Sequence, residues 1–230
     1  MLAVLIQGVP IRPQMYDANR ACRGLQSLPN LFKMKKKAVF LDRDGTINRD
    51  VGYPDSFSMI EIFPYSFEAV KQINQGGLLA VIVTNQSGVG RGLIKEKTLH
   101  EIHRKMRASF AKHGAHFDGI YYCPHYPASI NPKYREDCPC SKPNPGMAHR
   151  AAKELNIDIT NSYMVGDKVE DILFGLNIKA KSILLLTGYG QESLKKLKSL
   201  KIKPAYIAPD LLDAVNWILE KERNNSSITG

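Results

Sequence analysis

The sequence lacks a long hydrophobic run: no apolar stretch approaches the roughly 18 residues needed to span a bilayer. The run from Leu2 to Ile6 is too short for the core of a signal peptide and has no basic residue before it. We therefore expect a cytoplasmic protein that does not associate with membranes. With 230 residues and 43% hydrophobic content, the chain can form the core of one domain, with or without an appendage.

Cysteine and aromatic residues are also scarce. Three of the four cysteines lie between positions 123 and 140, a grouping that favours metal binding over disulfides in a cytosolic chain. Much of the net charge of +10 comes from lysines at positions 33–37 and 195–203, and aromatic residues are not interleaved with either cluster. This charge favours attraction to small phosphorylated substrates over binding to nucleic acid.

Short apolar runs alternate with helical patterns along the chain. Strands are expected at 38–41, 78–83, 120–122, 162–165, 182–186 and 206–208, and helices at 64–75, 95–113, 148–156, in the basic stretch before the last strand and around Trp217. His100 and His103, on the helix at 95–113, are interpreted as surface residues. This alternation predicts an α/β fold with an open parallel sheet and helices on both faces. We expect residues 1–33 to be an N-terminal extension or a mis-assigned start, residues 34–222 to be the domain, and residues 223–230 to be a polar tail.

Two carboxylates directly follow the first strand. Ala38 to Leu41 is wholly apolar, as in a strand buried on both faces, and it leads into Asp42 and Asp44. On an extended backbone these two side chains point the same way, and like charges this close favour a cation between them. Mg²⁺ prefers oxygen ligands and often recruits phosphate. The pattern predicts a magnesium site, although Asp-x-Asp alone also fits an acidic turn.

Later strands also end in polar residues. Thr84 to Gly88 follow the second strand and offer a hydroxyl and backbone N–H groups, which can hold a phosphate. Lys142 lies between a cysteine-containing loop and two prolines, where it can serve as a fixed cation for phosphate. Asp167 follows the fourth strand. Because the carboxyl ends of parallel strands meet at one edge of a sheet, we expect these residues to converge with Asp42 and Asp44.

A pair of short motifs suits a second metal. Cys123-Pro-His125 and Cys138-Pro-Cys140 are separated by twelve residues and supply three thiolates and one imidazole. This set predicts a tetrahedral structural Zn²⁺ with no open coordination position. The alternative is a group of reduced cysteines without a metal.

Together these residues resemble the haloacid dehalogenase (HAD) superfamily of phosphotransferases. The matching motifs are Asp-Arg-Asp-Gly-Thr at 42–46, Thr-Asn-Gln-Ser-Gly at 84–88, Lys-Pro at 142–143, and Gly-Asp-Lys at 166–168 with a later Asp171. With the cysteine motifs added, residues 37–188 look like the D-glycero-D-manno-heptose 1,7-bisphosphate 7-phosphatases. That resemblance implies a Mg²⁺-dependent phosphatase with an aspartyl-phosphate intermediate, which acts in the synthesis of ADP-heptose for lipopolysaccharide.

The resemblance also implies roles for individual residues. Asp42 is expected to be the nucleophile, and Asp44 the acid and then the base. Mg²⁺ is expected to bind the Asp42 side chain, the Asp44 backbone carbonyl and Asp167. Thr84 and Lys142 are expected to bind the phosphoryl oxygens. The substrate contacts of the family map onto Asp50, Val51, Gly52, Tyr53, Thr84, Asn85, Gln86, Ser87, Ser141, Lys142 and Lys168.

Two features depart from the usual family pattern. No insert is large enough for the cap domain that such enzymes often carry, so we expect the cysteine loop to border an open site for a sugar phosphate. We expect the protein to be a monomer. Ser141 stands where the family usually has an arginine, which removes a bidentate phosphate contact. The preference for a bisphosphate or for one anomer is therefore open, and Arg43, Arg91 and Arg135 are candidates to compensate.

Two other functions fit parts of the sequence. The first is a phosphatase for histidinol phosphate or another small sugar phosphate, since the histidinol-phosphate phosphatases share the same motifs. The second, from a different class, is a zinc-stapled basic module that binds nucleic acid. This second function leaves the three acidic strand ends unexplained.

Overall fold

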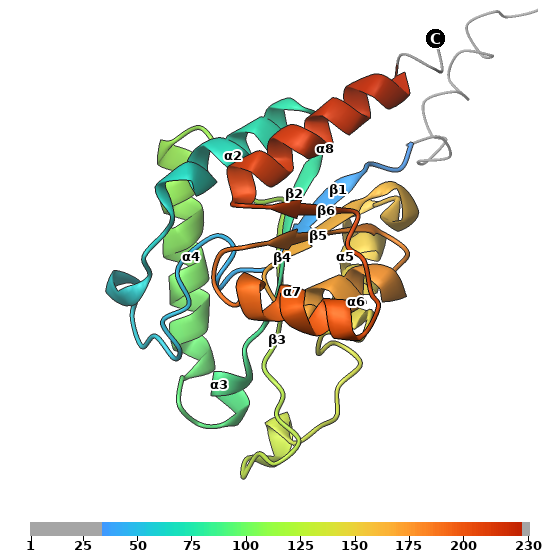
Figure 1. The fold of residues 1–230 in the computed structure, drawn as a ribbon. Coiled ribbons are helices and arrows are strands. Elements are labelled where there is room, and N and C mark those ends of the chain that lie inside the picture. The colour runs from blue at the N-terminus through green and yellow to red at the C-terminus, as the bar shows by residue number, and fades with distance from the viewer. Residues whose placement is uncertain (1–33, 227–230) are drawn as a thin grey trace, which may run out of the picture. The chain divides into compact units, whose positions relative to one another are not determined.

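The computed structural model describes residues 34–226. The predicted extension at 1–33 and the end of the predicted tail at 227–230 lie outside the described residues. Within 34–226, six parallel strands form one sheet in the order β3-β2-β1-β4-β5-β6 (Figure 1). The strands are β1 (Ala38–Leu41), β2 (Leu79–Asn85), β3 (Gly119–Cys123), β4 (Tyr163–Gly166), β5 (Lys181–Leu185) and β6 (Tyr206–Ala208). The predicted α/β fold with an open parallel sheet is confirmed.

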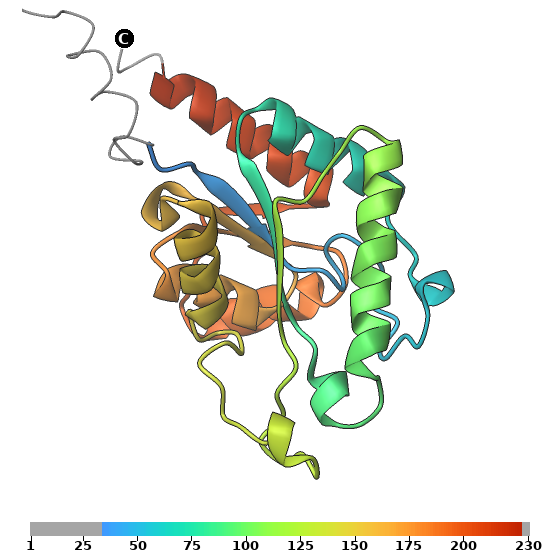
Figure 2. The same ribbon diagram turned by 180° about the vertical axis from the view of Figure 1, so that it is seen from behind.

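Helices cover both faces of this sheet (Figure 1, Figure 2). Because side chains alternate along a strand, Val39 and Leu41 pack into the core on one face, and Ala38 and Phe40 into the core on the other. The first core contains side chains of α2 (Pro64–Gln75), α4 (Glu96–Lys112) and α8 (Leu211–Ser226). The opposite face is covered by α5 (Gly146–Leu155), α6 (Val169–Asn177) and α7 (Gly190–Ser199).

Most predicted elements agree with the structure to within two residues; the main differences are at β2, α6 and α8, and the short helix at 87–90 was not predicted. The strand β2 continues through Thr84 and Asn85, which were expected to follow it. Helix α6 was not predicted, because it packs against β4, β5 and α7 and so lacks a broad polar stripe that would reveal its helical period. Helix α8 continues to Ser226 and includes the first residues of the predicted tail.

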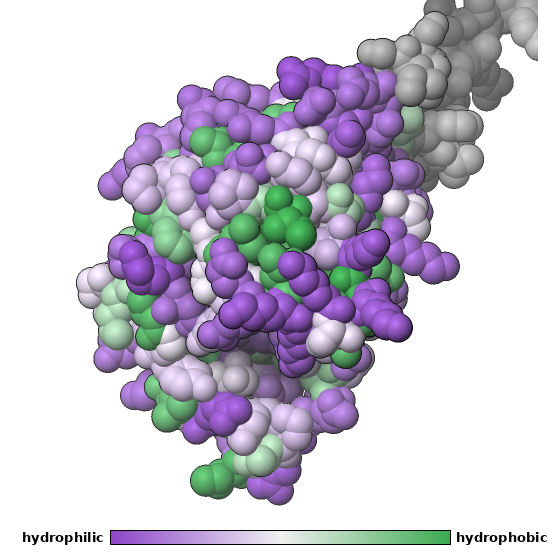
Figure 3. Space-filling view, in the orientation of Figure 1, coloured by the Kyte–Doolittle hydropathy of each residue, from purple (hydrophilic) through white to green (hydrophobic). Residues whose placement is uncertain are grey.

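The order of the strands determines where a ligand can bind. The chain runs from β1 outward to β2 and β3, then returns to the other side of β1 for β4, β5 and β6. Such a reversal leaves a crevice at the carboxyl ends of the two central strands. The short helix α3 (Ser87–Gly90) and the loop that joins β3 to α5 lie at this edge (Figure 1, Figure 2). In the same orientation, the surface is hollowed between this loop and the rest of the molecule (Figure 3).

The connections in the described part of the chain carry no inserted cap. Between residues 34 and 226 there is one sheet, and each link between its strands holds helices or a loop without a second sheet. None of the helices in this range combines the length and the apolar character that crossing a bilayer requires.

Candidate active site

Lys142 joins two carboxylates at the carboxyl end of β1. Its Nζ lies 2.7 Å from Asp42 Oδ1 and 2.5 Å from Asp171 Oδ1, and all three side chains are buried. Burial by itself lowers the pKa of Lys142, but the carboxylates of Asp171 and Asp42 outweigh it and raise that pKa to about 12. The lysine therefore stays charged next to Asp42.

Asp167 completes an acidic cluster at the same place. Carboxylate oxygens of Asp42, Asp167 and Asp171 all lie within 4.8 Å of one another. Oδ1 of Asp167 is buried and has no hydrogen-bond partner among residues 34–226. Opposite oxygen ligands of an octahedral Mg²⁺ lie about 4.2 Å apart, so these residues fit that ion. The structure thus brings Asp42 and Asp167 together, and it adds Asp171, for which no metal-binding role was predicted.

Two glycines enclose the carboxylate of Asp167. A Cβ atom at Gly45 or at Gly188 would collide with Oδ2 of Asp167, and both glycines have positive φ angles, +90° and +50°. The backbone N–H of Tyr189 donates to the same oxygen at 2.8 Å. The position of Asp167 therefore depends on backbone that approaches it closely from two sides.

Replacing Gly45 with alanine is expected to displace this carboxylate and to weaken Mg²⁺ binding by about 10- to 100-fold. Calorimetric titration with Mg²⁺ measures the loss. Gly114→Ala is the matched control, because Gly114 has a φ of +72° and a Cβ atom there would meet nothing within 4 Å. Both variants carry a backbone strain of about 1–2 kcal/mol. Equal Mg²⁺ affinities in the two would therefore contradict the proposal that a collision with the Asp167 carboxylate weakens Mg²⁺ binding.

Magnesium affinity is also expected to rise with pH. Burial, with Asp42 and Asp171 nearby, raises the pKa of Asp167 to about 8, and burial raises the pKa of Asp42 to about 6 against the opposing charge of Lys142. Without Mg²⁺ these carboxylates hold protons at pH 6 that the ion must displace. We expect an increase in affinity of about tenfold per pH unit near pH 7, steeper towards pH 6, which levels off above pH 8. Calorimetry in buffers of different ionisation enthalpy detects the protons released on binding. A Mg²⁺ affinity that does not change with pH would contradict the raised pKa values of Asp42 and Asp167.

Asp44 is not part of the acidic cluster. Its Oδ1 accepts hydrogen bonds from Arg43 Nε at 3.0 Å and Asn48 Nδ2 at 2.9 Å. Its Oδ2 accepts from Arg43 Nη2 at 2.6 Å and Gln86 Nε2 at 2.9 Å. The expectation that the Asp42 and Asp44 carboxylates flank one cation is therefore wrong: the chain bends at Arg43, so the alternation of a strand does not continue to Asp44.

The charge of Arg43 keeps Asp44 ionised. Burial alone would raise the pKa of Asp44, but the guanidinium beside it and the donated hydrogen bonds hold that pKa below its ordinary value. Arg43 itself is completely buried, and its Nη1 lies 3.3 Å from Nε2 of His103 on α4. His103 was interpreted as a surface residue from the sequence, and the structure corrects this. Its position four residues after Leu99 and three before Met106 places it on the buried side of α4.

The residues at the end of β2 contact the lysine-bearing loop. Thr84 is buried, and its Oγ1 accepts a hydrogen bond from Gln86 Nε2 at 2.9 Å. The side chain of Asn85 accepts from the backbone N–H of Lys142 at 2.9 Å and donates to its carbonyl at 3.1 Å. Asn85 and Gln86 were predicted as substrate contacts, and the structure gives their side chains these protein partners. Ser141 precedes Lys142 directly and is half-buried.

Lys168 and the loop after β1 contact each other next to the acidic cluster. Lys168 Nζ lies 3.0 Å from Asp50 Oδ2 and 4.9 Å from the centre of the Tyr189 ring. Burial lowers the pKa of Lys168, but the charges of Asp42 and Asp50 outweigh it, so the net shift is upward. Oδ1 of Asp50 accepts from the N–H of Gly52. The remaining predicted contacts are Val51, half-buried; Gly52 and Tyr53, exposed; and Ser87, half-buried.

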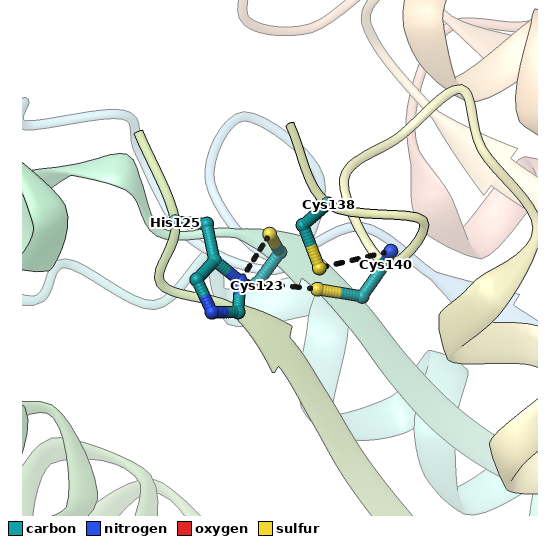
Figure 4. Close-up of side chains that lie close together, drawn as sticks. All are labelled: Cys123, His125, Cys138 and Cys140. Carbon is teal, nitrogen blue, oxygen red and sulfur yellow. Dashed lines mark hydrogen bonds between the residues drawn. The ribbon is translucent and has the colours of Figure 1, made fainter. Parts of the chain in front are cut away.

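The four predicted zinc ligands lie close together at the end of β3 and in the loop that follows it (Figure 4). His125 Nδ1 lies 3.6 Å from Cys123 Sγ and 3.5 Å from Cys140 Sγ. The backbone N–H of Cys140 donates to Cys138 Sγ at 3.2 Å. A tetrahedral Zn²⁺ with ordinary bond lengths separates a sulfur and a nitrogen ligand by about 3.6 Å. Cys123, His125, Cys138 and Cys140 therefore fit zinc in number, type and spacing.

Known proteins share this arrangement of motifs. The chain is 48% identical over 151 residues to the D-glycero-beta-D-manno-heptose-1,7-bisphosphate 7-phosphatase of Pasteurella multocida, an alignment that covers 66% of this chain and 82% of that protein. This chain belongs to the family of HAD-like hydrolases. A HAD-hydrolase-like family model matches residues 139–214, which include Lys142, Asp167 and Asp171.

Two further HAD-family proteins extend the similarity over more of the chain. The Escherichia coli K12 protein of the same name is 39% identical over 184 residues, 79% of this chain and 87% of that protein. The crystal structure of D,D-heptose 1.7-bisphosphate phosphatase from B. bronchiseptica, complexed with magnesium and phosphate, superposes with a TM-score of 0.72 at 30% identity. That match covers 80% of this chain and 99% of the other. The resemblance inferred from the sequence motifs is therefore confirmed.

Proposed function

We propose that this HAD-family chain is a Mg²⁺-dependent phosphatase that removes the 7-phosphate of D-glycero-β-D-manno-heptose 1,7-bisphosphate, in the supply of ADP-heptose for lipopolysaccharide. The observation that carries the proposal is Asp42, buried at the end of β1 between Lys142 and the other carboxylates of the acidic cluster. The names and similarity of the relatives support the choice of substrate.

In the proposed reaction, Asp42 attacks phosphorus in line with the departing sugar oxygen and becomes an aspartyl-phosphate. Lys142, with its ammonium group 2.7 Å from Asp42 Oδ1, holds the phosphoryl oxygens near the nucleophile, together with the Thr84 hydroxyl. Asp42, Asp167 and the Asp44 backbone carbonyl would hold Mg²⁺, which supplies positive charge between carboxylate and phosphate. Water then hydrolyses the aspartyl-phosphate and releases inorganic phosphate.

Asp44, which is ionised in the free protein, is proposed to take up a proton from solvent, to give that proton to the departing oxygen and then to take a proton from the attacking water. In the structure its two oxygens receive four hydrogen bonds. Because an ionised carboxylate offers about four acceptor directions, Asp44 must release at least one of these bonds to act on the substrate.

The sugar part of the substrate is proposed to contact the loop after β1 and Lys168, which are joined by the ion pair between Asp50 and Lys168. Of the three arginines that could replace the family's usual arginine at Ser141, two are occupied. Arg43 is buried against Asp44, and Arg135 donates to the carbonyls of Ser129 and Ile130. Arg91, whose guanidinium lies 3.8 Å from the centre of the Tyr126 ring, remains the candidate for a second phosphate.

Zinc is proposed to have a positioning role. Cys140 is separated from Lys142 by Ser141 alone, so a metal that fixes Cys140 also restricts the start of the segment that carries the lysine. Asn85 restricts the same segment from the end of β2. All four ligands come from the protein, so the zinc would have no open position for a substrate.

A panel of substrates tests the proposed function. Phosphate release would be measured with Mg²⁺ on both anomers of the heptose 1,7-bisphosphate, on sugar monophosphates and on histidinol phosphate. We expect the highest kcat/KM for a heptose bisphosphate, with inorganic phosphate taken from position 7. A higher kcat/KM for histidinol phosphate would contradict the heptose assignment and identify the chain as a histidinol-phosphate phosphatase.

A further inference from the structure

Arg43 is buried in a network that the proposed reaction does not use directly. Its side chain has 0% exposure, and its guanidinium donates to both oxygens of Asp44. Two groups from other elements hold the remaining side of the guanidinium. Gln86, after β2, accepts from Nη2 at 3.2 Å, and His103, on α4, lies 3.3 Å from Nη1.

The chemistry of arginine defines the state of His103. A guanidinium has donors and no acceptors, so Nε2 of His103 must accept the hydrogen bond and the ring proton must be on Nδ1. The imidazole is therefore neutral. Burial and the positive charge of Arg43 favour the same state, since they lower the pKa of His103 to about 3.

We propose that His103 is a positioning residue for the phosphatase reaction: it fixes the guanidinium of Arg43 and, through it, the carboxylate of Asp44. The inference rests on the proposed function, in which Asp44 is the acid and base. His103 itself does not touch the reacting atoms, and its effect reaches the departing oxygen through two side chains.

The geometry explains why the guanidinium of Arg43 needs the contact with His103. Arg43 and Asp44 are neighbours in sequence, so their paired hydrogen bonds alone do not fix the guanidinium relative to α4 and the end of β2. Asn48 and Gln86 also donate hydrogen bonds to Asp44. Gln86, after β2, and His103, on α4, hold the outer side of the guanidinium. Without His103, a charged donor would be buried without that partner, a costly state that displaces the guanidinium towards another acceptor or water. Asp44 would then lose part of the support from Arg43 and would be held mainly by Asn48 and Gln86.

Dependence on the leaving group separates this role from a purely structural one. An alkoxide needs a proton from Asp44 to depart, whereas p-nitrophenolate departs without one. The experiment compares phosphoryl transfer to Asp42 from the heptose bisphosphate and from p-nitrophenyl phosphate, by rapid quench with Mg²⁺. The variants are His103→Leu and His103→Gln, whose amide oxygen can accept from Arg43. The control is His100→Leu, one turn away on α4, exposed and bonded to Tyr122.

We expect His103→Leu to slow transfer from the sugar phosphate by about 10- to 100-fold, with KM and the transfer from p-nitrophenyl phosphate changed less than about threefold. His103→Gln should recover most of the rate, and His100→Leu should match the parent protein. Equal slowing with both substrates, or no slowing, would overturn the proposal. If the parent protein hydrolyses neither substrate, the proposed function itself fails, which is a separate outcome. Rates are taken well below the unfolding temperature, and His103→Met replaces the leucine variant if that variant does not fold.

Discussion

Replacing Asp42 with asparagine is expected to reduce turnover by about 10⁴-fold or more, because an amide cannot accept the phosphoryl group and its nitrogen is not a nucleophile under these conditions. The substitution preserves the shape of the side chain. Lys142 keeps its contact with Asp171 at 2.5 Å, so its charge does not become unpaired. Steady-state phosphate release measures the loss.

The same variant is expected to remain folded. Burial raises the pKa of Asp42 to about 6, so the folded protein disfavours the ionised carboxylate at neutral pH and loses little when it is replaced by a neutral amide. The unfolding temperature of the variant should therefore differ from that of the parent protein by only a few degrees. The matched control is Asp158→Asn: the N–H of Asp158 donates to Lys36, before β1, at the edge of the sheet opposite the site. Asp42→Asn with more than a tenth of the parent turnover would contradict the assignment of the nucleophile.

Removing a zinc ligand is the second change with a large expected effect. Cys138→Ser and Cys140→Ser are expected to lose the bound zinc, to lower the unfolding temperature and to reduce kcat by about 10²-fold. The reason is distance along the chain: Cys140 lies two residues before Lys142, and a shift of that segment by about 1 Å misplaces the ammonium group relative to Asp42. Metal analysis gives the zinc content, and calorimetry gives the stability.

Cys22→Ser is the control for this experiment, because the four-ligand set is complete without Cys22. It should retain one zinc per chain and full turnover. A zinc-free Cys140→Ser protein with parental kcat would show that Asn85 and the surrounding backbone position Lys142 without the metal. That result would remove the proposed link between zinc and catalysis, while the acidic cluster would be unaffected.

Much of the fold could be predicted because its strands are short, apolar and buried on both faces. The strand at 38–41 and the helix at 64–75 were predicted with the bounds that the structure has. The cysteine motifs were informative because few other patterns place three thiolates and one imidazole so close together. Residues that follow parallel strands meet at one edge, so Asp42 and Asp167 could be expected to converge.

Side-chain direction beyond the end of a strand could not be predicted. The alternation rule holds only while the backbone is extended, and the bend at Arg43 gives Asp44 a different set of partners from Asp42. Asp171 was visible in the sequence, but only the packing of α6 against β4 brings it to Lys142. His103 lay on the apolar stripe of its helix, and the spacing from Leu99 was the signal that pointed to its burial.

The acceptance of a phosphoryl group by Asp42 is the central claim, and trapping the intermediate tests it most directly. The protein would be mixed with the heptose bisphosphate and Mg²⁺, quenched in acid within milliseconds and analysed by mass spectrometry. We expect a fraction of chains to carry one phosphoryl group, sensitive to hydroxylamine and located at Asp42, and none in the Asp42→Asn variant. Rapid turnover with no phosphorylated chain at any quench time, or with the phosphoryl group on another residue, would contradict the account.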